Sequence, residues 1–179
     1  NLQTGKENDE LALADNDESV SAQTDTEVLS VDNSTYSKLS EEINQSGNVK
    51  LAYKNYVYDN GDSISITEDN KVIDGNGAVI DMAGSTIRAF HVSASGVTIK
   101  NLTIKNANYD GQGGAIYFSV SATSGTVTNC NFAGNTVDYG GGAVYFSSTG
   151  NVLNCNFADN TASGDGGAVY FLNTGSVSN

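Results

Sequence analysis

The strongest constraint on this chain is a six-residue segment that occurs three times in almost the same form. It reads Gly-Gly-Ala-Ile-Tyr-Phe at 113–118 and returns with Val in place of Ile at 141–146 and 166–171. A second segment, Asn-Cys-Asn-Phe, occurs at 129–132 and 154–157. Repetition at a fixed period is typical of solenoids, so these segments constrain the fold more than any other feature.

The spacing of the segments distinguishes between solenoid types. Gly142 and Gly167 are 25 residues apart, whereas Gly114 and Gly142 are 28 apart, so a loop insertion falls between 119 and 125. A leucine-rich horseshoe has a similar period, but these units are β-branched or aromatic, rich in Gly and Asn, and contain no helical run. The pattern therefore predicts an all-β chain folded as a right-handed parallel β-helix.

Alternation along three short strands per coil separates interior from exterior side chains. Residues i and i+2 of a strand share a face, so the apolar set faces the interior. Successive coils then place similar residues in the same position. We expect two columns of core side chains, namely Leu102, Cys130 and Cys155, and Ile104, Phe132 and Phe157.

The two cysteines of the first column leave two states open. Neighbouring coils bring their α-carbons to a separation that a disulfide accepts, but in-register parallel strands give awkward side-chain angles. Buried free thiols are therefore favoured over a disulfide at Cys130 and Cys155. Zinc is disfavoured, because the chain has no further cysteine and its one histidine should lie one coil or more away on the opposite side of the backbone.

An asparagine lies between the second and third strand of each coil. Asn is the non-glycine residue that best tolerates a left-handed backbone in a short turn, and stacked amides can bond from coil to coil. We interpret these residues as a structural ladder of Asn101, Asn129, Asn154 and Asn179.

Composition divides the chain into a tail and one domain. Residues 1–35 hold nine acidic residues and one lysine, so we expect a disordered acidic segment over 1–33. Residues 34–179 should form the β-helix, opened by a capping helix at about 34–47, with Asn33 or Ser34 as N-cap and Gly47 as its end. The last coil ends at its asparagine turn, so we expect either that the native protein continues with further coils or that the open edge pairs with another copy of the chain.

Two families share these motifs. Gly-Gly-Ala-Ile/Val with Phe-x-x-Asn, at 132–135 and 157–160, resembles the repeats of polymorphic membrane proteins. The region 36–81, with its helix and Ile-Asp-Gly-Asn-Gly string, resembles the start of adhesin-like surface proteins of methanogenic archaea, within the pectate-lyase-like β-helices. The resemblance implies a secreted, repetitive protein at the cell surface that binds glycans or partner-cell proteins.

Charged residues give little support to catalysis. Polysaccharide-cleaving β-helices need converging carboxylates, usually with Arg or Lys, but no Glu follows Glu68 and the Asp residues stand in turn-like contexts. The one combination worth testing is Arg88 and His91 with Asp74 or Asp81. We expect no enzyme activity; a fragment of a polysaccharide lyase or glycoside hydrolase is the alternative.

Other ligand classes are also weakly supported. One Arg and seven Lys cannot form the basic stripe that nucleic acid requires, and no apolar stretch is long enough to span a membrane. Calcium could bind at the Asp and Asn turns, but the glycine-rich calcium nonapeptide is absent and no cofactor is expected.

The candidate binding residues are aromatic. Alternation places His91, Tyr117, Tyr145 and Tyr170 outward on one sheet, one per coil. Such a stripe could stack on sugar rings or a partner surface, although Tyr is also a good strand former. The sequence thus predicts an extracellular adhesin-like scaffold that presents this stripe to a glycan or protein.

Overall fold

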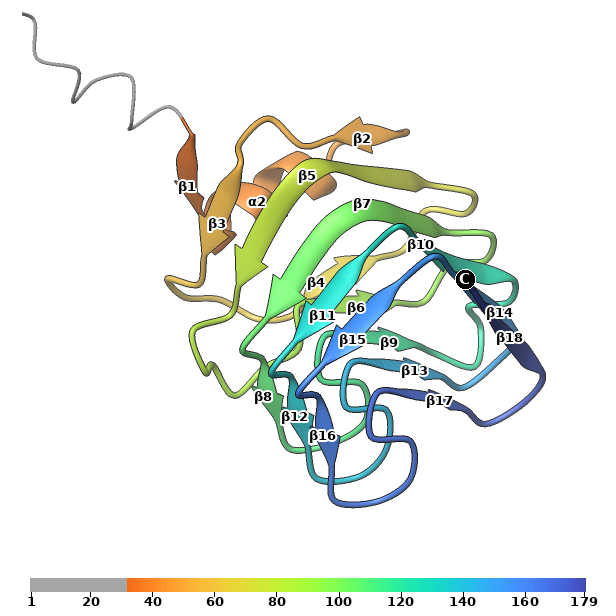
Figure 1. The fold of residues 1–179 in the computed structure, drawn as a ribbon. Coiled ribbons are helices and arrows are strands. Elements are labelled where there is room, and N and C mark those ends of the chain that lie inside the picture. Colours follow the sequence, from red (N-terminus) through yellow and green to blue (C-terminus); the bar gives the residue numbers. More distant parts are fainter. Residues whose placement is uncertain (1–31) are drawn as a thin grey trace, which may run out of the picture.

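A computed structural model describes residues 32–179. These residues form a parallel β-helix, and the colours of Figure 1 follow its coils in sequence order. All strand pairs run parallel, and the strands form three sheets of ten, five and three strands. The predicted fold class is thereby confirmed. Residues 1–31 of the acidic segment that was predicted to be disordered lie outside the described residues. Asn33, which the prediction included in this segment, belongs to a strand.

The ten-stranded sheet runs the length of the helix. It consists of β1 (Asn33–Thr35), β2 (Val49–Lys50), β3 (Asn55–Val57), β5 (Val72–Asp81), β7 (Thr98–Lys105), β10 (Gly125–Thr128), β11 (Asn131–Ala133), β14 (Gly150–Leu153), β15 (Asn156–Ala158) and β18 (Gly175–Ser178).

The other two sheets form the remaining sides of the coils. The five-stranded sheet contains β4 (Ile64–Ile66), β6 (Phe90–Val92), β9 (Ile116–Phe118), β13 (Val144–Phe146) and β17 (Val169–Phe171). The three-stranded sheet contains β8 (Asn108–Tyr109), β12 (Thr136–Val137) and β16 (Thr161–Ala162).

A repeated coil contains four short strands rather than the predicted three. The fourth, such as β12, follows Phe-x-x-Asn and buries Val137 completely. Two residues are too few to show a period, which is why alternation did not reveal this strand. The three-residue insertion lies in the loop between β9 and β10, as the spacing predicted, and exposes Val120.

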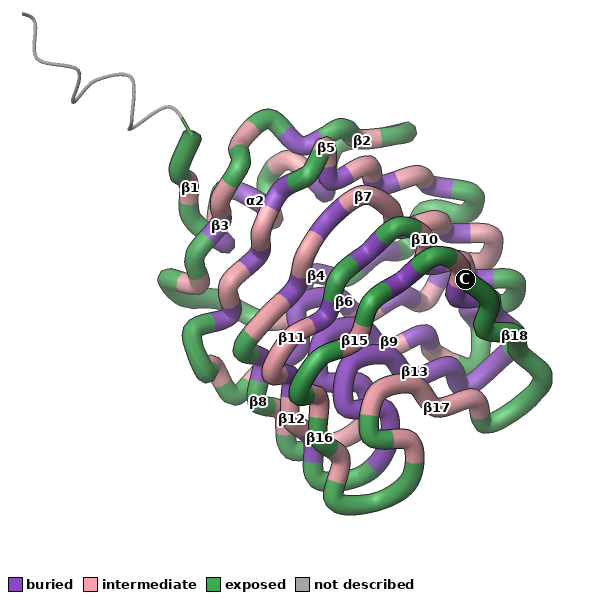
Figure 2. The backbone as a smooth tube through the Cα atoms, viewed as in Figure 1, coloured by how far each residue is buried: buried purple, intermediate pink, exposed green. Residues whose placement is uncertain are grey.

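Columns of like residues fill the interior. Phe146 stacks on Phe118 and Phe171 with ring centroids 4.4 and 4.9 Å apart. Phe132 pairs with Ile104 and stacks on Phe157 at 5.2 Å, and Leu102, Cys130 and Cys155 are almost fully buried. Figure 2 shows buried and exposed residues alternating along the strands. The interior of the coils is therefore filled by apolar side chains that recur from coil to coil.

The glycine pair has two distinct jobs. Gly141 has a left-handed backbone with φ 67°, which glycine adopts without strain. Gly142 is needed for a close approach, because a methyl group there would lie 2.0 Å from the carbonyl oxygen of Gly167 on the next coil. The repeated Gly-Gly is therefore a contact between neighbouring coils.

The asparagine of Phe-x-x-Asn is a buried clamp between coils, a role that the sequence analysis missed. Asn135 is fully buried; its Oδ1 accepts from the Ala107 N–H at 3.1 Å and its Nδ2 donates to the Ile104 carbonyl at 3.1 Å. Its Nδ2 also donates to Asn160 Oδ1 at 2.9 Å. Each such amide satisfies backbone groups of the preceding coil that would otherwise be buried without partners.

Helix α2 (Tyr36–Ile43) packs over the first coil and buries Tyr36, Leu39 and Ile43. The predicted N-caps, Asn33 and Ser34, are wrong, because both residues pair with β3 and Thr35 caps the helix by accepting from the Lys38 N–H at 3.2 Å. The helix ends at Ile43, well before Gly47.

Glu42 of this helix turns its carboxylate toward the first coil. Its Oε2 accepts from Tyr56 Oη and the Ala52 N–H, both at 3.0 Å, and its Oε1 is buried without a partner among the described residues. The carboxylate therefore ties the helix to the first coil.

Candidate binding site

The four predicted aromatic residues lie in one column on the five-stranded sheet. His91 on β6 pairs with Tyr117 on β9, Tyr117 with Tyr145 on β13, and Tyr145 with Tyr170 on β17. We call these four side chains the aromatic column.

The rings of the aromatic column stack on one another. Tyr117 and Tyr145 lie 5.6 Å apart with 26° between planes, and Tyr145 and Tyr170 lie 5.0 Å apart with 19° between planes. His91 meets Tyr117 edge to face at 5.3 Å. Ring faces inside the column are therefore occupied by neighbouring rings, so a ligand meets mainly edges and hydroxyl groups.

Exposure along the aromatic column is lower than an open stripe requires. His91, Tyr117 and Tyr170 are half-buried, and Tyr145 is only 6% exposed. The loop before β13 lies against the column, since a methyl group on Gly140 would be 3.5 Å from the Tyr145 ring. Burial, then the neighbouring Tyr170 and Tyr117, raise the pKa of Tyr145.

Arg88 extends the aromatic column sideways, a contact that no sequence signal indicated. Its guanidinium carbon lies 4.2 Å from the ring centroid of Tyr109 and 4.4 Å from that of Tyr117. The side chain is buried, and burial lowers its pKa. Stacking between two rings stabilises a cation that has no carboxylate within ion-pair distance in residues 32–179.

The catalytic combination considered from sequence is not assembled. Asp74 pairs with Lys100 at 3.5 Å and Asp81 with Lys105 at 3.0 Å, all on the ten-stranded sheet. His91 instead faces the aromatic rings, and burial followed by the charge of Arg88 lowers its pKa. The two carboxylates therefore hold neighbouring coils together rather than facing the histidine.

A small cavity opens beside the aromatic column, and we call it the tyrosine pocket. Its volume is about 190 Å³. Loops of three successive coils supply its walls together with β13 and β17, and it is lined by Gln112, Tyr139, Gly140, Tyr145, Gly164, Asp165 and Tyr170. Tyr139 is 62% exposed. The pocket thus combines aromatic rings with one carboxylate and one carboxamide.

The predicted asparagine ladder has the expected backbone but different bonds. Asn101, Asn129 and Asn154 have φ of 58, 53 and 51°, the left-handed conformation that the sequence analysis assigned. Asn179 Oδ1 accepts from the Cys155 N–H at 3.2 Å. Amide-to-amide bonds lie elsewhere, at Asn135 with Asn160 and at Asn131 with Asn156.

The two cysteines are free and buried on adjacent coils. Each thiol points to a backbone carbonyl, Cys130 Sγ to Thr128 at 3.3 Å and Cys155 Sγ to Leu153 at 3.2 Å. The hydrogen bond with the Cys155 thiol, and then burial, raise the pKa of Cys130. Both side chains act as small core residues in this arrangement.

Within residues 32–179, no cluster of three or more His, Cys, Asp or Glu side chains could hold a metal ion. In the same part of the chain, no helix is long and apolar enough to cross a membrane.

Comparison with known families identifies the repeat. Residues 129–147 and 154–172 each match the model of the Chlamydia polymorphic membrane protein repeat. Each match runs from the asparagine turn through the third and fourth strands of a coil and the first strand of the next coil, which carries the Tyr of the aromatic column, so it covers most of one structural repeat. Searches of curated proteins and of solved structures each found no significant match.

Proposed function

We propose that this chain is the non-enzymatic scaffold of an extracellular, adhesin-like protein whose coils present a surface for attachment to a glycan or a protein. One observation carries the proposal: the matched segments contain residues that hold one coil on the next, such as Asn135 and Gly142. A sequence repeated for stacking builds an elongated surface, and extended concave or flat surfaces suit binding more than catalysis.

The surface location rests on the repeat. The polymorphic membrane protein repeat belongs to surface-associated proteins of Chlamydia. The resemblance of 36–81 to adhesin-like proteins of methanogenic archaea, within the pectate-lyase-like β-helices, supports the same role. Protein and glycan partners are equally compatible with a net charge of −13, whereas nucleic acid is disfavoured.

Bead adhesion tests the proposal. Beads coated with the full chain should be retained on immobilised cell-surface extracts or purified polysaccharides, and beads coated with an unrelated β-helix should not. If new reducing or unsaturated sugar ends form after incubation with a polysaccharide panel, the chain is an enzyme and the scaffold proposal is wrong. If the coated beads are retained no better than the control beads, and no new reducing or unsaturated sugar ends form, the chain does not mediate attachment.

A further inference from the structure

The tyrosine pocket contains two polar side chains that have no side-chain partner among residues 32–179. Asp165 forms no ion pair and Gln112 no side-chain hydrogen bond with any described residue. Asp74 and Asp81, by contrast, are each bonded to a lysine and to an asparagine amide. The carboxylate and the carboxamide of the pocket therefore remain available to a ligand.

The tyrosine pocket is also lined by Tyr139, whose ring stacks on no other ring of the described residues. Tyr139 belongs to the loop after β12, and among residues 32–179 its ring makes no stacking contact. Its 62% exposure leaves a flat apolar surface in water. Such an aromatic surface beside a cavity is an energetically favourable contact for the C–H face of another molecule.

The size and chemistry of the pocket select a ligand class. A volume of about 190 Å³ accommodates one sugar ring but no large cofactor. Asp165 and the acidic chain disfavour anions. The exposed Tyr139 ring offers an apolar face, which suits the C–H face of a neutral ring. A neutral ring with hydroxyl groups fits all of these groups at once.

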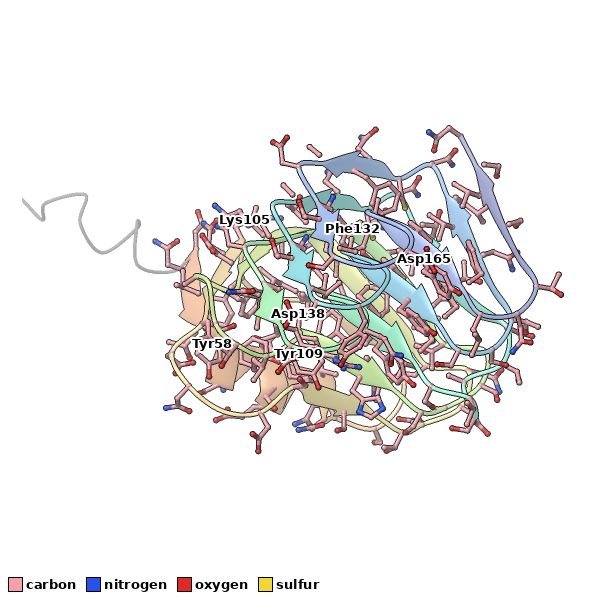
Figure 3. The ribbon with its side chains drawn as sticks, turned by 90° about the horizontal axis from the view of Figure 1, so that it is seen from below. Tyr58, Lys105, Tyr109, Phe132, Asp138 and Asp165 are labelled. Atoms are coloured by element: carbon pink, nitrogen blue, oxygen red, sulfur yellow. The ribbon has the colours of Figure 1, made fainter. Side chains whose placement is uncertain are left out.

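We infer that the tyrosine pocket binds one residue of a neutral saccharide, an inference that rests on the proposed attachment function and names its ligand class. The sugar ring packs on Tyr139, while its hydroxyl groups donate to the Asp165 carboxylate and bond to the Gln112 carboxamide. Because the walls come from three coils, the pocket requires the native stack. Figure 3 shows Asp165 in the last coils and Asp138, which does not line the pocket, nearer Tyr109.

Titration calorimetry with neutral hexasaccharides tests the inference. The probes are the hexamers of β-1,4-glucose, β-1,4-xylose, β-1,4-mannose and β-1,4-N-acetylglucosamine, added to the full chain. We expect at least one to bind, and Asp165→Asn and Tyr139→Ala each to weaken it at least tenfold. The matched controls Asp138→Asn and Leu172→Ala, both exposed and outside the pocket, should stay within twofold.

The outcomes separate the pocket from the scaffold function. Binding that survives both pocket variants, or no binding by any hexamer, overturns the pocket as a neutral saccharide site. Bead retention that persists in Asp165→Asn and Tyr139→Ala leaves the attachment function standing on another surface. Unchanged circular dichroism and unfolding midpoints of the variants exclude a folding defect as the cause of lost binding.

Discussion

The repeated coils between 113 and 171 and the first coils between 33 and 81 are held together by different kinds of contact. In the repeated coils, identical residues stack in columns, as Phe146 does on Phe118 and Phe171. In the first coils, single contacts join unlike residues, as Glu42 does with Tyr56. Columns can be extended coil by coil, whereas the first-coil contacts occur once and close one end of the stack.

The substitution that should cost the most stability interrupts a column of stacked core rings. Phe146→Ala removes a fully buried ring between two others, and we expect a loss of about 4 kcal/mol in the free energy of unfolding. Urea denaturation measures it. Phe171→Ala, on a half-buried ring of the last coil, should cost clearly less. Equal losses at the two positions would contradict the view that stacking on both sides stabilises a column.

The second effect removes the amide clamp. Asn135→Ala leaves the Ala107 N–H and the Ile104 carbonyl without their partner, so we expect a loss of about 3 kcal/mol. Asn131→Ala is the matched control, because the exposed Asn131 amide bonds, within residues 32–179, only to the Asn156 and Thr103 side chains. This substitution should cost about 0.5 kcal/mol or less. A similar loss at both asparagines would show that burial does not distinguish them.

The same contrast explains how far the sequence could be interpreted. In the repeated coils, each residue pairs with the equivalent residue 25 positions further along the chain. The period therefore predicts that Phe132 pairs with Phe157 and Tyr145 with Tyr170. Fold, register and the aromatic column followed from that period. The exposure of the column did not, because the period gives the register of the strands but not how closely the loop at Gly140 lies against the Tyr145 ring.

Unique contacts carried no such signal. Nothing in the sequence pairs Arg88 with Tyr109 and Tyr117, because the three residues come from three segments and meet only through the coil geometry. The role of Asn135 could have been inferred from the recurrence of Phe-x-x-Asn. This motif places an amide three residues after a buried Phe ring in the same coil.

A third prediction concerns the first coils. Tyr36 Oη donates to the Ala89 carbonyl at 2.7 Å and accepts from the Ile64 N–H at 3.0 Å, so one hydroxyl joins the helix to two neighbouring coils. Tyr36→Phe keeps the ring and removes both bonds of the hydroxyl, but the Ile64 N–H still donates to the Ala89 carbonyl at 3.1 Å, so we expect a loss of about 1.5 kcal/mol. Thermal unfolding measures it. A neutral result would mean that ring burial alone holds the cap.

The smallest effect is pH-dependent and concerns an ion pair between two coils. The Asn76 backbone N–H, the Asn101 amide and Lys100 lower the pKa of Asp74. A carboxyl group with a lowered pKa in the folded state stabilises the fold above its unfolded pKa of about 4 and loses that contribution as pH falls through the folded value.

Denaturation of Asp74→Asn across pH therefore sharpens the comparison. At pH 7 the variant should be less stable than the parent chain by about 1 kcal/mol, because the pair is partly solvated. The difference should shrink as the pH falls and vanish once the pH lies below the lowered pKa of the folded Asp74 carboxyl group, where the parent carboxylate is protonated as well. Asp138→Asn changes an exposed carboxylate without an ion pair in the described chain and should leave the pH profile unchanged. A constant difference at all pH values would assign the role of Asp74 to its hydrogen bonds rather than to its charge.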